Sequence, residues 1–305
     1  MKKAAVISCI LTMAIWVPVQ CSPQSQPASG QSASTAAAGQ AAPAAGPAAK
    51  RPPQAKTQPE YDAWKAAAAN TDPAAMEKAA DDFASKYPDS ELRVLLYKNT
   101  MRSYQNANNP EKIEATGRKV ISIDPDDPEA LVSVAEIIAE KTRDTDIDKD
   151  QRYAEGIKLA QKSLQTIDTD VSVPGGATQQ QVDAYKASLR SRAYSAIGSI
   201  EYNQNNFVAA QGDFQKAIDA VPNDPYALDV LHLALSIDKQ ATAETDRDKQ
   251  RAMYTEALKV ANRAVDLTKE NTPLGTPARH ERDRLQQLIG ASAPATPAAS
   301  QPPKN

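Results

Sequence analysis

Apolar residues between positions 58 and 290 recur with a helical period, in segments separated by Pro and Asp. This pattern predicts a chain of amphipathic helices and requires no strand. Pro opens many of the segments, and it is tolerated in a first helical turn because its missing N–H has no helical partner there. The predicted helices span residues 59–70, 73–86, 90–106, 110–123, 128–141, 149–165, 181–203, 207–220, 225–239, 248–267 and 277–288.

Composition supports the helical interpretation. Aromatic residues make up only 5% of the chain, Gly occurs 11 times in 305 residues, and Ala dominates many stretches. Sheets favour β-branched and aromatic residues, whereas Ala-rich segments favour helices. The net charge is −3 with both signs interspersed, so there is no basic stripe for a nucleic acid.

One segment carries a repeat signature. With Gly198 taken as position 8 of a 34-residue repeat, eight residues fall at positions 4, 7, 8, 17, 20, 24, 27 and 32. They are Tyr194, Ile197, Gly198, Phe207, Ala210, Phe214, Ala217 and Pro222. This segment resembles a tetratricopeptide repeat (TPR), with Glu201 at position 11 as its departure.

Neighbouring segments resemble weaker copies of the same repeat, and together the copies cover residues 58–268. Gly117 stands where the family usually has an aromatic residue. Two units contain matched insertions, Asp148-Lys149-Asp150-Gln151-Arg152 and Asp248-Lys249-Gln250-Arg251. The resemblance implies an all-α fold, a right-handed superhelical solenoid of TPR-like helical hairpins with a C-terminal capping helix over 279–288.

The N-terminus resembles an export signal. Lys2 and Lys3 precede an apolar core over 4–19 that is shorter than the ~20 residues of a spanning helix. Cys21 follows this core and resembles the lipidated residue of a bacterial lipoprotein, although Gln20 departs from that pattern; ordinary signal cleavage is the alternative. We expect a signal peptide over 1–21 and export to the periplasm or a periplasm-facing membrane, with secretion as the other destination.

Two further segments lack apolar periodicity. Residues 22–57 are rich in Ala, Pro, Gln and Ser, and residues 291–305 contain four Pro. Such segments bury too little apolar surface to offset the entropy of ordering. They predict a flexible linker and a disordered tail around a repeat domain over 58–290.

Catalytic and cofactor chemistry finds little support. The histidines, His232 and His280, have no triad partner or second ligand near them in sequence. Gly175-Gly176 is not followed by the Lys-Ser/Thr of a phosphate loop. We therefore expect a protein that is not an enzyme and binds no cofactor.

One acidic segment has the spacing of a calcium loop. Five carboxylates fall at its positions 1, 3, 5, 7 and 12, and Ca²⁺ prefers such oxygen ligands. Lys149 replaces the Gly of the sharp turn, so the alternative is an acidic cap on the next helix. The candidate metal ligands are Asp144, Asp146, Asp148, Asp150 and Glu155.

In TPR proteins, positions 2, 5, 9 and 12 of each first helix face a concave groove that holds a partner polypeptide. The third unit places Glu129, Val132 and Glu136 at such positions. The other units give the candidate partner-binding residues Lys98, Arg102, Gln105, Arg192, Ser195, Ser199, Tyr202, Tyr226 and Asp229.

The resemblance implies a protein-interaction scaffold of the bacterial cell envelope, with an unidentified protein or peptide as partner. Two alternatives remain open. One is an envelope-assembly lipoprotein of the outer-membrane protein insertion type, held in the membrane only by a lipid on Cys21. The other is a calcium-responsive module that uses the acidic loop over 144–155.

Overall fold

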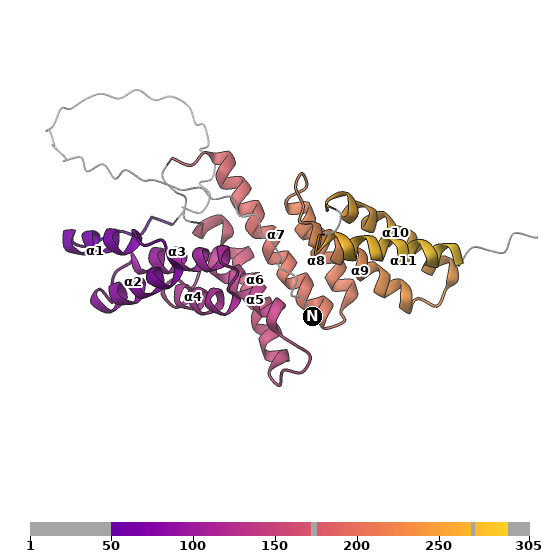
Figure 1. Ribbon diagram of the computed structural model, residues 1–305, viewed down its shortest axis with the longest axis horizontal. Coiled ribbons are helices and arrows are strands. Elements are labelled where there is room, and N and C mark those ends of the chain that lie inside the picture. The colour runs from indigo at the N-terminus through magenta and orange to yellow at the C-terminus, as the bar shows by residue number, and fades with distance from the viewer. Residues whose placement is uncertain (1–49, 172–175, 270–271, 292–305) are drawn as a thin grey trace, which may run out of the picture.

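The computed structural model describes residues 50–171, 176–269 and 272–291, which form eleven α-helices and no strand (Figure 1). This confirms the predicted all-α class. The helices are α1 (Gln58–Ala68), α2 (Pro73–Lys86), α3 (Arg93–Asn106), α4 (Pro110–Ile123), α5 (Pro128–Lys141), α6 (Lys149–Asp170), α7 (Gln179–Asn203), α8 (Phe207–Ala220), α9 (Ala227–Ala243), α10 (Arg247–Asp266) and α11 (Gly275–Ala291).

Side-chain caps explain where several helices begin. The carboxylates of Asp72 and Asp127 accept hydrogen bonds from backbone N–H groups in the first turns of α2 and α5, and Asn109 does the same for α4. Each cap precedes a Pro. The cap side chain therefore satisfies a free backbone N–H of the first turn, and the Pro removes another because it has no N–H. These three helices have the predicted bounds.

The helices pack as successive antiparallel pairs, α1–α2 through α9–α10, and α11 packs on α10. The fold is therefore a helical solenoid, elongated in Figure 1, with α7 running between the N-terminal and C-terminal halves. Ala278 and Leu285 of α11 are fully buried against the last pair. This is the position expected of a capping helix, which covers an apolar face that has no further repeat.

Small residues allow the helices to approach closely. A Cβ atom on Gly198 would lie 3.1 Å from the ring of Phe214, and one on Gly156 would lie 2.7 Å from Ile200. Gly117 of α4 meets Val134 of α5 at 2.7 Å in the same way. The departure from the repeat signature at Gly117 thus has a packing reason, since an aromatic side chain has no room there.

Residues 50–57 differ from the expectation of a flexible linker over 22–57. They form an extended strap bound to the helices: the Lys50 N–H donates to the Thr169 carbonyl at 3.0 Å, and its ammonium lies 2.5 Å from Asp124. Arg51 makes two hydrogen bonds to Glu91. The described fold therefore begins before α1. The predicted signal peptide, residues 22–49 of the linker and the tail beyond 291 lie outside the described residues.

None of the described helices is both long and apolar enough to cross a bilayer.

Candidate partner-binding surface

The first helices of successive pairs, α3, α5, α7 and α9, are joined by a row of polar side chains. We call this row the inter-helix ladder. It is made of Lys98, Arg102, Gln105, Asp127, Glu129, Ser133, Glu136, Arg192, Ser195 and Asp229.

The ladder between α3 and α5 is ionic. The Lys98 ammonium lies 2.6 Å from Asp127 and 3.2 Å from Glu129. Arg102 donates two hydrogen bonds to the same Glu129 carboxylate, at 2.6 and 2.5 Å. The side chains of Lys98, Asp127 and Glu129 are each less than 10% exposed. Buried charges of this kind are tolerated only when they are paired.

This pairing shifts the pKa values of both partners. Burial alone would raise the pKa of Glu129, but the positive charges of Arg102 and Lys98 outweigh it and hold that pKa far below its usual value. Burial alone would lower the pKa of Lys98, but the negative charges of Glu129 and Asp127 outweigh it and raise that pKa. Both groups are therefore ionised throughout the physiological range.

Ser133 connects three helices. Its hydroxyl accepts a hydrogen bond from the Gln105 amide of α3 at 2.9 Å and one from the Arg192 guanidinium of α7 at 3.1 Å. Arg192 also donates two bonds to Glu136 of α5. The α3–α5–α7 side of the solenoid is thus fixed by directional bonds as well as by apolar packing.

The last step of the ladder joins α7 to α9. The Ser195 hydroxyl donates to Asp229 Oδ1, while Asp229 Oδ2 is buried without a hydrogen-bond partner. Burial raises the pKa of Asp229 to about 7; the bond from Ser195 opposes this rise and the negative charge of Glu136 adds to it. A second contact links Ser188 and Tyr226 through their hydroxyls, at 3.2 Å.

The predicted partner-binding residues differ in how far they are exposed to solvent. The side chain of Arg102 is 48% exposed and Tyr226 is 47% exposed, so both can contact a partner. Lys98 and Asp229 are 7% and 2% exposed and serve contacts within the chain. The other candidates, which are partly buried, are Gln105, Arg192, Ser195, Ser199 and Tyr202. Binding of a partner by the accessible residues stays a prediction.

Sequence reasoning missed Ser133 and Tyr185. Ser133 stands at none of the four groove positions, yet it bonds to two predicted groove residues. Tyr185 lies on the N-terminal part of α7, which is longer than an ordinary repeat helix; burial and the charge of Glu129 raise its pKa. The unusual length of the predicted 181–203 helix was the sequence feature that could have pointed to Tyr185.

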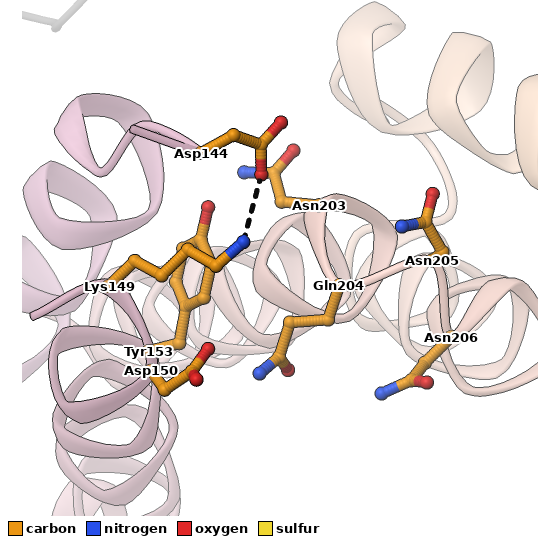
Figure 2. Close-up of a pocket in the computed structure, with 8 residues that line it drawn as sticks. All are labelled: Asp144, Lys149, Asp150, Tyr153, Asn203, Gln204, Asn205 and Asn206. Atoms are coloured by element: carbon orange, nitrogen blue, oxygen red, sulfur yellow. Dashed lines mark hydrogen bonds and ion pairs between the residues drawn. The ribbon is translucent and has the colours of Figure 1, made fainter. Parts of the chain in front are cut away.

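The five calcium-loop candidates do not converge. Asp146 accepts a bond from the backbone N–H of Arg143, and Glu155 on α6 pairs with Arg118 at 2.6 Å. Asp144 lies 3.4 Å from the ammonium of Lys149 (Figure 2). Within the described ranges, no group of three or more His, Cys, Asp or Glu side chains could hold a metal ion.

The side chain of His232 packs against aromatic rings. Its ring stacks on Tyr202 at 5.9 Å and lies 5.1 Å from Phe214. Burial lowers its pKa to about 4, so the ring is neutral at physiological pH. A neutral ring between two aromatic rings is suited to hold α7, α8 and α9 together.

Comparison with known proteins finds a distant structural similarity. No protein-family model and no curated protein matches the sequence. The crystal structure of the APC/C hetero-tetramer Cut9–Hcn1 is similar over 73% of this chain and 46% of that chain, with 13% identity and a TM-score of 0.30. This chain therefore spans less than half the length of that neighbour. The stacked helical hairpins and the close contacts at Gly117, Gly156 and Gly198 show an all-α solenoid of helical hairpins.

Proposed function

We propose that this chain is a non-enzymatic protein-interaction scaffold that binds a partner polypeptide on the side of the solenoid formed by α3, α5, α7 and α9. The inter-helix ladder is the observation that carries the proposal. It pairs the buried charges of Lys98, Asp127 and Glu129 in contacts that fix the helices. Arg102 and Tyr226 are about half exposed on that side. Aromatic and Arg side chains on a rigid surface are the residue types that dominate protein interfaces.

Photo-crosslinking in cells tests this proposal. We expect a photoreactive phenylalanine analogue at Tyr226 to capture a defined polypeptide, seen as a discrete band of higher mass and identified by mass spectrometry. Replacement there keeps an aromatic ring at the exposed residue that directly precedes α9. Glu256 is the matched control, because it is exposed but lies on α10, a second helix of a pair. Equal capture from both positions, or none from Tyr226, would contradict a partner on the α9 side.

We also propose that this scaffold acts in the bacterial cell envelope, as an exported protein anchored by a lipid on Cys21. This part depends on the sequence of residues 1–21, which lie outside the described structure. We expect the intact mass of the mature chain to correspond to a diacylglyceryl group on an N-terminal Cys21. A mature chain that begins at Ser22 or later would exclude the anchor and leave the binding surface untouched.

A further inference from the structure

The joint between α7 and α9 differs in chemistry from the other steps of the inter-helix ladder. Arg102 closes the α3–α5 step with an ion pair, and Arg192 closes the α5–α7 step in the same way. At the α7–α9 step, the hydroxyl of Ser195 donates to Asp229, which forms no ion pair with any described residue. Helix α9 packs mainly on α8 and α10, so this step is also the weakest link between the two halves in Figure 1.

Three serines lie along the face of α7 that meets α9. Ser188 contacts Tyr226 and Ser195 contacts Asp229, and Ser191 lies between the two serines at helical spacing. Asp229 is 2% exposed and Ser191 is fully buried. The Oδ2 atom of Asp229 and the Oγ atom of Ser191 are buried without a hydrogen-bond partner among the described residues. The closed joint therefore leaves buried polar atoms unsatisfied, which costs stability.

The charges around Asp229 favour its neutral form. Burial and the negative charge of Glu136 on α5 raise the pKa of Asp229 to about 7, and the bond from Ser195 opposes this rise. Arg192 of α7 donates to Glu136 instead, and no charged group of α8 or α10 acts on Asp229. His232, one turn later on α9, lies among aromatic rings and is neutral at physiological pH.

The ionised carboxylate of Asp229 has an alternative partner in its own helix. Asp229 is the third residue of α9, and the N-cap residue Tyr226 makes no side-chain cap hydrogen bond. In a capping box, the side chain of the third residue accepts the N–H of the N-cap residue, and negative charge is favoured at this end of a helix. The N–H of Tyr226 makes no hydrogen bond with a described residue. An ionised Asp229 can therefore bond to the start of α9 and to water once this turn leaves α7.

We propose that Asp229 is a proton-operated latch between α7 and α9. With its proton, the carboxyl group stays against Ser195 and the joint is closed. Without it, the carboxylate turns to the start of α9, and the first turn of α9 separates from α7. Arg102 on α3 and Tyr226 directly before α9 lie on opposite sides of this joint, so opening changes their separation. This last consequence, a pH-dependent shape of the partner-binding surface, rests on the proposed function.

The open joint gains population as the pH rises. Between an ordinary pKa of 3.8 and the raised pKa of about 7, the closed joint holds a proton that the open joint has released. The ratio of open to closed molecules should therefore increase about a hundredfold from pH 5 to pH 8 and level off above pH 7. His232 does not contribute, because its lowered pKa of about 4 keeps it neutral over this range.

Spin labels measure the opening directly. The full chain carries Cys9→Ser and Cys21→Ser, with one label on Ala184→Cys of α7 and one on Leu228→Cys in the first turn of α9, two exposed positions. Double electron–electron resonance at pH 5 should give one main distance between the labels. At pH 8, we expect a second distance in a substantial fraction of molecules, longer by ~5 Å, the pitch of one helical turn.

Two kinds of control separate the latch from a general loosening of the solenoid. Asp229→Asn should keep the shorter distance at both pH values, because its side chain is neutral throughout. Asp219→Asn, which removes an exposed charge on α8, should behave like the unmodified chain. A second label pair, on Asn106→Cys of α3 and Glu140→Cys of α5, spans the ionic step and should keep one distance.

A single, constant distance between α7 and α9 from pH 5 to pH 8 would overturn the latch. The same lengthening in Asp229→Asn, or between the labels on α3 and α5, would also overturn it, because the cause would then lie elsewhere. Failure of the photo-crosslink at Tyr226 would count against the partner-binding surface and leave the latch unaffected, so the two proposals remain distinguishable.

Discussion

Replacing Lys98 with Met should lower the free energy of unfolding by about 3–5 kcal/mol. The substitution keeps the apolar stem but removes the ammonium that lies between Asp127 and Glu129. Asp127 then keeps its helix-capping bond to Ala130 but loses its ion pair with Lys98, in a position that is 1% exposed. A buried carboxylate without a counter-charge is among the most destabilising changes in a protein interior.

Urea unfolding followed by circular dichroism measures this effect. Lys162→Met is the matched control, because Lys162 pairs at 2.8 Å with Asp126, the residue before Asp127, and the two side chains are 37% and 52% exposed. Exposed pairs contribute about 0–1 kcal/mol. If the two variants lost similar stability, the buried ladder would not hold α3 and α5 together as inferred.

Asp229→Asn should become more stable than the unmodified chain as the pH rises from 5 to 8, by about 3 kcal/mol in total. The pKa of Asp229 is about 7 in the folded chain, against an ordinary 3.8. Between these values, the folded state holds a proton that the unfolded state has released. The unmodified chain therefore loses stability as pH rises through this window, and the neutral Asn removes that loss.

The free energy of unfolding should be compared at each pH, because burial lowers the pKa of His232 to about 4 from an ordinary 6.5. Stability therefore rises with pH through the lower part of this window on account of His232, which opposes the effect of Asp229. Taking the difference between the two proteins cancels this contribution. Asp219→Asn, a change of an exposed side chain on α8, controls for the loss of one negative charge. A difference that stayed constant from pH 5 to pH 8 would show that Asp229 is ionised normally in the joint between α7 and α9.

Local signals in the sequence predicted most of the helices. Asp or Asn followed by Pro located the starts of α2, α4 and α5, because the cap and the ring act within one turn. The predicted lengths of α6 and α7 were too short: α6 continues five residues beyond 165, and α7 begins two residues before 181. The start of α7 depends on a capping box between Thr178 and Gln181, in a polar stretch with no apolar residue to mark it.

The surface was predicted only in part. Positions that face a groove in the family also face the next repeat, and the sequence of one repeat does not show which contact prevails. Lys98 and Glu129 pair because they come from adjacent units and carry opposite charges, which a comparison of successive units could have shown. A polar pocket lies between the 144–150 segment and the amides at 203–206 (Figure 2), and no local pattern connects residues so far apart in sequence.

The strap over residues 50–57 determines how the domain responds to force. Lys50 is bonded to the α4–α5 connection through Asp124 and to the C-terminal end of α6 through Thr169. Tension applied to the chain at Lys50 therefore reaches the middle of the solenoid directly, and α1 and α2 are shielded from it until those bonds break. A scaffold attached through its N-terminal segment would thus remain folded at its end while it is pulled. Its resistance would be set by the three ion pairs and the backbone hydrogen bond that Lys50 and Arg51 make with the helices.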